Sequence, residues 1–267
     1  METKELGNTG VIVPEIGIGV WRYRGGAEPL RRGIDLGATL IDTAEVYGTE
    51  DVVGQAIKGI RDRIFVATKV SGEHLGHDQL LRAANASLRR LDISIIDLYQ
   101  IHWPNSSVPI KETMRAMETL VDRGLVKYIG VSNFSLFEMR AAQAAMSKYP
   151  IVANQVLYNL NRREIEADLM PYCERNRISI IAFTPLDDGR LTSMPRFRAN
   201  QKMRSLSHIA QETGKTLGQV ALNWCTSRPC VITIPKSNHA DRVAENCGAS
   251  GWRLSKSQVQ ALDAAFS

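Results

Sequence analysis

The 267-residue chain lacks several features that would assign it to a broad class. No apolar run approaches the ~18 residues that a membrane span requires, and the charged residues 1–5 are not followed by the apolar segment of a signal peptide. We therefore expect a cytoplasmic protein without membrane segments. The four cysteines show no CxxC or zinc-ligand spacing, which favours reduced structural thiols over a metal site.

Acidic residues are missing from one long stretch of this mildly basic chain, whose net charge is +5. The segment between Gly189 and Gln211 has no acid. Its basic residues are Arg190, Arg196, Arg198, Lys202 and Arg204. This pattern is compatible with a solvated loop or with a flap over an anionic ligand, and composition does not decide between them.

Eight short apolar runs alternate with helical patterns along the chain. The predicted strands are 16–20, 39–42, 63–69, 95–102, 127–132, 151–156, 178–184 and 231–234, and the predicted helices are 29–36, 51–58, 78–91, 110–123, 136–146, 165–176, 206–213, 217–226, 240–247 and 257–265. Asp78 is expected to cap its helix. This order predicts an α/β fold, a (β/α)8 TIM barrel in one domain over 1–267, with a short N-terminal β-hairpin at 5–14 and an extra C-terminal helix. A doubly wound sheet would alternate in the same way and remains the alternative.

Polar side chains stand where the predicted strands end, and in a barrel these ends converge on one face. They are Asp42 and Tyr47, Lys69, His102, Ser132 and Asn133, Asn154 and Gln155, and Lys236 and Ser237. Each alone has a structural explanation, such as a turn aspartate, a surface lysine or a capped core histidine. Their joint placement favours a site.

This set of side chains suits the protonation of an oxygen. The phenol of Tyr47 is a proton donor in reserve, and the ammonium of Lys69 is expected to lower its pKa toward working pH. Asp42 would keep Lys69 charged, and His102 would hydrogen-bond a substrate oxygen. No nucleophile is paired with a base and no metal-ligand set is recognisable. The pattern therefore favours carbonyl reduction by an external hydride carrier.

The sequence resembles the aldo-keto reductase family over nearly its whole length. The motifs are Leu-Ile-Asp-Thr-Ala-Glu-Val-Tyr-Gly, Val-Ala-Thr-Lys, Ile-His-Trp-Pro, Gly-Val-Ser-Asn-Phe and Ile-Pro-Lys-Ser followed by Arg and Glu-Asn. The resemblance places the catalytic tetrad of the family on Asp42, Tyr47, Lys69 and His102. It implies a barrel that binds a nicotinamide cofactor without a Rossmann fingerprint, and no GxGxxG follows Gly17.

The resemblance also implies a cofactor site. Ser132, Asn133 and Gln155 would bind the nicotinamide carboxamide, and Phe183 would stack on the ring where the family commonly has tyrosine. Lys236, Ser237 and Arg242 would clamp the adenosine 2′-phosphate, with Glu245 and Asn246 near the adenine. Two cations and a hydroxyl suit a phosphate monoester, so NADPH is expected over NADH.

Two departures from the family pattern affect this expectation. After the seventh strand the family usually has Ser-Pro-Leu-Gly, whereas this chain has Thr184-Pro185-Leu186-Asp187-Asp188-Gly189. Leu186 and Asp188 are expected beside the cofactor, in a flap whose carboxylates pair with the basic residues that follow. The carboxy-terminal loop is short or absent, which predicts an open pocket. Trp21, Trp103 and Tyr23 would form apolar walls suited to small aldehydes, ketones or dicarbonyls.

Two other functions are alternatives to a reductase. The segment 205–224 resembles a helix-turn-helix, although the family carries a packed helix pair there, so we expect no nucleic-acid partner. The chain could also be a cofactor-binding regulatory or structural subunit, a reading that the intact tetrad disfavours. The expected partner is a small carbonyl compound, and the expected assembly is a monomer or small homo-oligomer.

Overall fold

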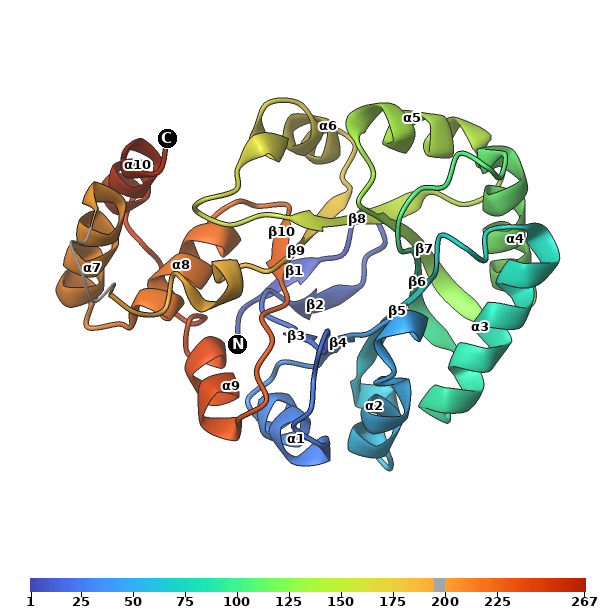
Figure 1. Ribbon diagram of the computed structural model, residues 1–267, viewed down its shortest axis with the longest axis horizontal. Coiled ribbons are helices and arrows are strands. Elements are labelled where there is room, and N and C mark those ends of the chain that lie inside the picture. The colour runs from blue at the N-terminus through green and yellow to red at the C-terminus, as the bar shows by residue number, and fades with distance from the viewer. Residues whose placement is uncertain (195–199) are drawn as a thin grey trace.

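The computed structural model describes residues 1–194 and 200–267, and its centre is an eight-stranded parallel sheet (Figure 1). The strands, paired in chain order, are β3 (Ile18–Gly19), β4 (Leu40–Asp42), β5 (Phe65–Val70), β6 (Ile96–Ile101), β7 (Val126–Ser132), β8 (Ile151–Leu157), β9 (Ser179–Phe183) and β10 (Val231–Thr233). Ile16 and Thr233 form a parallel bridge that joins the two edges, with Gly17 N–H donating to the Thr233 carbonyl at 2.8 Å. The (β/α)8 barrel is confirmed, and the consecutive strand order excludes a doubly wound sheet.

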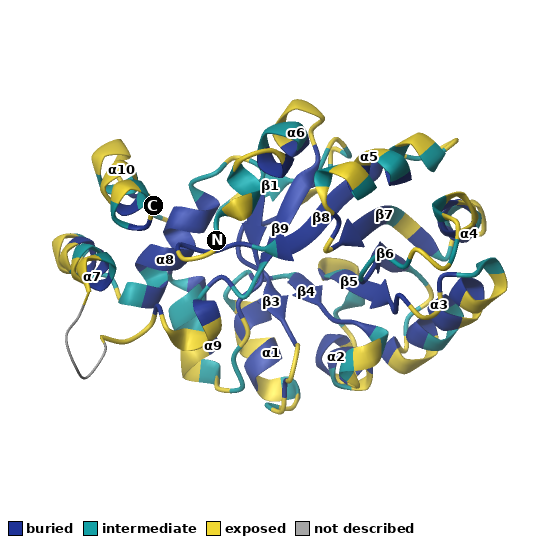
Figure 2. Ribbon diagram, turned by 45° about the horizontal axis from the view of Figure 1, so that its top comes forward, coloured by how far each residue is buried: buried dark blue, intermediate teal, exposed yellow. Residues whose placement is uncertain are grey.

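Most of the helices surround the sheet, with their buried sides toward it and their exposed sides toward solvent (Figure 2). They are α1 (Ala27–Asp35), α2 (Glu50–Ile57), α3 (His77–Leu91), α4 (Ile110–Asp122), α5 (Leu136–Ala145), α6 (Leu169–Arg175), α7 (Gln201–Thr213), α8 (Leu217–Thr226), α9 (Ala240–Cys247) and α10 (Lys256–Ala265). Capping boxes begin α5, α8 and α10. None of the helices in the described part of the chain has the length and apolarity needed to cross a bilayer.

A two-stranded hairpin closes the amino-terminal end of the barrel. Strands β1 (Thr3–Glu5) and β2 (Ile12–Pro14) pair antiparallel, and Leu6 and Val13 pack in one buried cluster with the barrel residue Leu40. Gly7 is required at the turn, because its φ is +58° and a Cβ there would lie 2.7 Å from the carbonyl oxygen of Val152. The hairpin predicted from the sequence is therefore a plug that leaves the opposite end of the barrel open.

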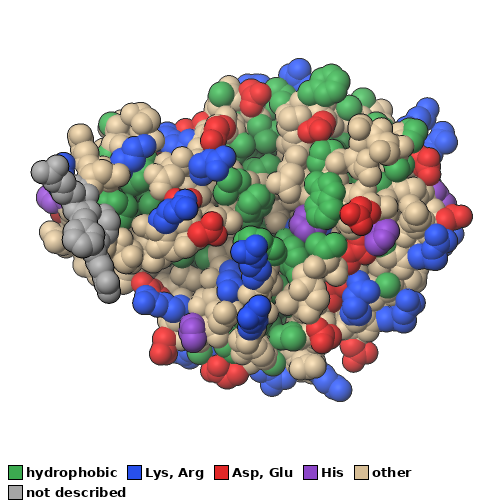
Figure 3. All heavy atoms as spheres, in the orientation of Figure 1, with side chains coloured by type: hydrophobic (Ala, Val, Ile, Leu, Met, Phe, Trp, Pro, Cys, Tyr) green, Lys and Arg blue, Asp and Glu red, His purple; other side chains and the backbone are tan. Residues whose placement is uncertain are grey.

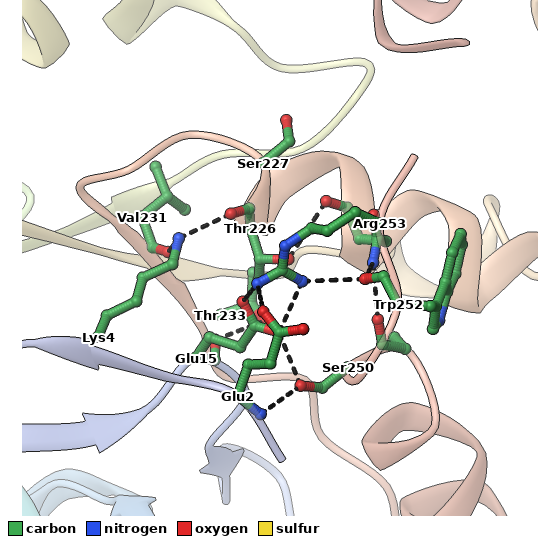
Figure 4. A network of polar contacts seen from close by, with 12 residues as sticks. Glu2, Lys4, Glu15, Thr226, Ser227, Val231, Thr233, Ser250, Trp252 and Arg253 are labelled. Atoms are coloured by element: carbon green, nitrogen blue, oxygen red, sulfur yellow. Dashed lines mark hydrogen bonds and ion pairs between the residues drawn. The ribbon is translucent and has the colours of Figure 1, made fainter. Parts of the chain in front are cut away.

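A polar network links this plug to the carboxy-terminal segment (Figure 4). Lys4 Nζ donates 2.7 Å hydrogen bonds to the carbonyl oxygens of Thr226, Arg228 and Val231. The fully buried carboxylate of Glu15 pairs with Arg253 at 2.7 Å and accepts the hydroxyl of Ser250. Since a buried charge is tolerated only when it is paired, these contacts fasten the plug in place.

Two local predictions need correction. Helix α3 begins after Gly76 without a side-chain cap, and Asp78 lies inside the first turn, where its carboxylate pairs with His77. The first strand is only two residues long, because the chain from Ile16 onward bridges β10 before it pairs with β4.

In the helix pair at 205–224, α8 packs on the barrel strand β10, and α7 packs against α8 and α10. Leu206, Ile209, Val220 and Trp224 of α7 and α8 are all buried, and the Trp224 ring stacks on Tyr158 with centroids 5.3 Å apart. Its apolar faces are therefore used in the core, as in the packed pair that the family resemblance implies.

Candidate active site

Two adjacent strands bring Asp42 and Lys69 together inside the barrel. Asp42 ends β4, and Lys69 lies near the end of β5, where its side chain is fully buried. Lys69 Nζ donates to Asp42 Oδ2 at 2.6 Å and to the carbonyl oxygen of Thr43 at 2.8 Å. A buried ammonium needs such partners, and these two direct its remaining N–H toward the open end of the barrel.

Tyr47 lies above this pair on a single 3-10 turn, η1 (Glu45–Tyr47), which ends at Gly48 in the left-handed conformation. Its hydroxyl is 3.5 Å from Lys69 Nζ and 3.3 Å from Nε2 of His102. Burial raises the pKa of Tyr47, and the charge of Lys69 lowers it by less, so the pKa stays above its usual value. The expectation of a lowered pKa is therefore wrong: Lys69 only offsets part of the cost of burying a phenolate.

His102 directly follows β6 and faces both Tyr47 and Trp103. Its ring meets that of Tyr47 edge-on at 5.3 Å, and the Trp103 ring lies 4.6 Å away. Burial, followed by the charge of Lys69, lowers the pKa of His102 to about 3. The imidazole is therefore neutral at physiological pH, with Nδ1 buried and unpartnered among the described residues and Nε2 beside the phenol.

Side chains from β8 and from the residue that follows β7 complete the floor. Gln155 Nε2 donates to Asp42 Oδ1 at 2.7 Å, and Asn133 Nδ2 donates to the carbonyl oxygen of His102 at 2.9 Å. Asn133 has a φ of +61°, a conformation that asparagine tolerates better than most residues. Asn154, the other amide predicted at this strand end, instead donates to the carbonyl oxygen of Phe134 and does not line the cavity.

These residues open into a cavity of about 930 Å³ at the carboxyl ends of the strands. Its lining includes Asp42, Tyr47 and His102, both predicted tryptophans, and all the predicted cofactor residues, namely Ser132, Asn133, Gln155, Phe183, Leu186, Asp188, Lys236, Ser237, Arg242, Glu245 and Asn246. Lys69 is buried behind the cavity wall and does not line the cavity. Figure 3 shows hydrophobic side chains near the middle of the face seen in Figure 1, with Lys and Arg side chains beside them.

One pocket wall was assigned wrongly, and others were missed. Tyr23 is buried outside the cavity and donates its hydroxyl to the Gly26 carbonyl. Of the three expected apolar walls, Trp21 and Trp103 therefore line the cavity and Tyr23 does not. Arg22, Val46 and Arg162 also line the cavity. Arg22 follows Trp21, and Val46 lies inside the motif that ends in Tyr47-Gly48, so both could have been found by proximity, whereas Arg162 carries no such signal.

The end of the cavity near α9 has donors suited to a phosphate. Lys236, Ser237 and Arg242 line it, and Arg242 pairs with Glu245 at 2.5 Å. Burial, followed by the charge of Arg24, lowers the pKa of Lys236. An ammonium, a hydroxyl and a guanidinium are good ligands for an anion, so this donor set fits a phosphate monoester.

The acidic pair after β9 is only partly arranged as expected. Asp187 is buried, accepts the amide of Asn161 at 3.0 Å and lies 3.7 Å from Arg190, which is one ion pair of the expected flap. Asp188 is exposed at the cavity, with a φ of +52°. Arg196 and Arg198 lie outside the described residues, and closure over a cofactor stays a prediction.

Among residues 1–194 and 200–267, no group of three or more His, Cys, Asp or Glu side chains is arranged to hold a metal ion.

A sequence model of the aldo/keto reductase family matches residues 15–266. The chain belongs to this family. It is therefore an oxidoreductase of the aldo/keto reductase type.

Relatives of this aldo/keto reductase have similar length and fold. Methylglyoxal reductase YeaE of Escherichia coli is 36% identical, over 96% of this chain and 92% of its own. Glyoxal reductase of Bacillus subtilis is 34% identical, over 98% and 92%. The thermostable aldo-keto reductase Tm1743, solved with the inhibitor epalrestat, is 38% identical over 99% and 100%, with a TM-score of 0.92. A Klebsiella pneumoniae reductase solved with NADP and acetate is 35% identical over 100% and 96%, with a TM-score of 0.89.

Proposed function

We propose that this chain reduces the carbonyl group of an aldehyde or ketone to an alcohol with NADPH. The supporting observation is the convergence of Tyr47, Lys69 and His102 at the floor of one cavity, whose other end has the phosphate-binding donors. Neither feature alone indicates this reaction. A proton donor and a set of donors suited to a phosphate, both along one continuous cavity, together support it.

Tyr47 is the proposed general acid. Its O–H donates a proton to the substrate oxygen as negative charge develops there, and the ammonium of Lys69 at 3.5 Å stabilises the phenolate that remains. Asp42 accepts a hydrogen bond from Lys69 Nζ and holds the side chain in place. His102, neutral at working pH, uses Nε2 to hydrogen-bond the same oxygen and orient the carbonyl.

NADPH, when bound, supplies the hydride. Ser132, Asn133 and Gln155 would hold its carboxamide, Phe183 would stack on the ring, and Leu186 and Asp188 would lie beside its bridging phosphates. Lys236, Ser237 and Arg242 would bind the 2′-phosphate, with Glu245 and Asn246 at the adenine. NADH lacks this phosphate and should bind less tightly. The Klebsiella reductase structures, which contain NADP or NADPH, support this assignment.

The proposed substrates are small aldehydes, ketones or dicarbonyls. Trp21, whose side chain is partly exposed, and Trp103 offer apolar walls beside Tyr47. The names of two relatives, a methylglyoxal reductase and a glyoxal reductase, support a small dicarbonyl in particular.

The test is NADPH oxidation followed at its nicotinamide absorbance, with 4-nitrobenzaldehyde and methylglyoxal as substrates and NADH in parallel. We expect turnover with at least one carbonyl compound and a higher kcat/KM with NADPH. Tight NADPH binding without turnover on a broad carbonyl panel would instead favour the regulatory reading. A gel shift with a steep salt dependence would revive DNA binding through 205–224.

Three further expectations stay predictions. They are a single domain over 1–267, a cytoplasmic location, and a monomer or small homo-oligomer. Limited proteolysis, cell fractionation and light scattering would test them in turn.

A further inference from the structure

The turn that presents Tyr47 has little intrinsic stability. It is a three-residue 3-10 helix without a side-chain cap, between Ala44 in an extended conformation and Gly48 in a left-handed one. Its own backbone contributes the hydrogen bond from Tyr47 N–H to the Ala44 carbonyl, at 3.1 Å. So short a turn needs contacts from elsewhere to hold a side chain in one place.

Glu45 provides such a contact. Its carboxylate Oε1 accepts a hydrogen bond from the backbone N–H of Ser71 and lies 3.0 Å from Nδ1 of His74. The Glu45 side chain is only 9% exposed, whereas that of His74 is 48% exposed, so the Ser71 contact is the sheltered one. Charge-assisted hydrogen bonds of this kind are roughly twice as strong as neutral ones.

The two residues that make this contact are close in sequence to Tyr47 and Lys69, whose polar atoms lie near each other in the site. Glu45 precedes Tyr47 by two residues, and Ser71 follows Lys69 by two residues. The contact therefore joins the turn that carries the phenol to the strand that carries the ammonium. The separation of Tyr47 and Lys69, 3.5 Å between their polar atoms, is at the outer limit of a hydrogen bond, so a small slip of the turn would break it.

We propose that Glu45 is a positioning residue, whose hydrogen bond to Ser71 sets the distance between the Tyr47 hydroxyl and the Lys69 ammonium. The inference rests on the proposed function, because it assumes that Tyr47 is the acid. It predicts that Glu45 acts on the chemical step and leaves cofactor binding unchanged, since Glu45 does not line the cavity.

The chain contains a matched control. Glu118 on α4 is likewise buried, and its carboxylate accepts the backbone N–H of Ser147 at 2.7 Å and the Ser147 hydroxyl at 2.7 Å. Ser147 lies in the loop before β8, at the end of the barrel opposite the cavity. Glu118 therefore ties helix α4 to this loop by the same chemistry but holds no residue of the site.

The experiment compares Glu45→Ala, Glu45→Gln and Glu118→Ala in the full chain. We expect Glu45→Ala to lower kcat about tenfold to a hundredfold with an unchanged Kd for NADPH, because a displacement of about 1 Å has effects of this size. Glu45→Gln keeps an acceptor oxygen for Ser71 and should stay within about threefold of wild-type kcat. Glu118→Ala should lose stability at unchanged kcat.

Several outcomes would overturn the proposal. They are a Glu45→Ala kcat equal to that of Glu118→Ala, a kcat for Glu45→Gln as low as that of Glu45→Ala, or a raised NADPH Kd in Glu45→Ala. If Glu45→Ala does not fold, Glu45→Asp replaces it, because its carboxylate is one methylene short of Ser71 and its kcat should fall below that of Glu45→Gln. An inactive wild type, or a fully active Tyr47→Phe, rejects the proposed function itself and is distinguishable from these results.

Discussion

Gln155 donates its amide N–H to Oδ1 of Asp42 at 2.7 Å, from the opposite part of the barrel wall. With Lys69 on Oδ2, both carboxylate oxygens of Asp42 are engaged. The amide nitrogen of Gln155 is therefore committed to the floor, and its carbonyl oxygen is the atom left for a ligand in the cavity. That oxygen can accept from the carboxamide N–H of a nicotinamide, so the structural and ligand roles of Gln155 are compatible.

Tyr47→Phe tests the proposed proton donor. The phenyl ring fills the same space without the hydroxyl, so kcat should fall by about 10²- to 10⁴-fold, the usual contribution of a general acid, while the Kd for NADPH stays constant. Steady-state kinetics and fluorescence titration measure the two quantities. Tyr128→Phe is the control, because Tyr128 stacks on Phe65 outside the cavity and should keep its activity. Full activity in Tyr47→Phe would remove the acid from the mechanism.

Asp42→Ala should destabilise the fold by about 3–5 kcal/mol, because it leaves the fully buried ammonium of Lys69 without its counter-charge. Urea unfolding measures the change. Asp122→Ala breaks a pair of similar length, 2.6 Å to Lys148, between exposed side chains that water already solvates, and should cost far less. Equal losses in the two variants would mean that burial of the Asp42–Lys69 pair has no energetic consequence.

The depressed pKa of His102 predicts a pH dependence of stability. In the unfolded chain this imidazole takes up a proton near pH 6.5, whereas in the fold it does so only near pH 3. Between these values the unfolded state binds more protons, so the free energy of unfolding should fall as the pH falls from 6.5 toward 3, by at most about 1.4 kcal/mol per pH unit from this residue. Urea unfolding of wild type and His102→Gln across this range should show a shallower slope in the variant. Parallel curves would show that His102 titrates normally in the fold.

Lys236→Ala tests the phosphate seat. Loss of one charged donor should raise the Kd for NADPH about tenfold to a hundredfold and leave that for NADH within about twofold, since only NADPH carries the 2′-phosphate. Fluorescence titration with both cofactors measures this. Lys111→Ala on α4 removes the same charge from an exposed site outside the cavity and should change neither value. If Lys236→Ala weakened both cofactors equally, Lys236 would bind a group that they share.

The sequence predicted the alternation of strands and helices. It also predicted the convergence of Asp42, Tyr47, Lys69 and His102, because barrel topology places strand ends on one face. The features that escaped prediction depend on packing. The pKa of Tyr47 reflects how much burial outweighs Lys69, and this balance exists only in the folded state. Tyr23 lies in an aromatic stretch next to Trp21, but the turn at Val20–Tyr23 directs its ring into the core.

Local signals failed where tertiary contacts replaced them. Asp78 has the chemistry of a cap, yet α3 starts before it, and Glu112 of α4 accepts the N–H of His77 at 3.0 Å instead. Glu45 carries no mark in the sequence beyond its place between Asp42 and Tyr47. Its partner Ser71 is 26 residues away, so only the folded chain reveals their contact.

The glycine-containing hairpin turn beneath the barrel offers a handle for immobilising the enzyme. Asn8 on this turn is exposed, whereas Cys173, Cys225 and Cys247 are buried and Cys230 is half-buried. An Asn8→Cys variant would therefore present one fully accessible thiol at the base of the molecule. If every copy were coupled to an electrode or a bead through that thiol, the open end of each barrel, with the candidate active site, would face the surrounding solution.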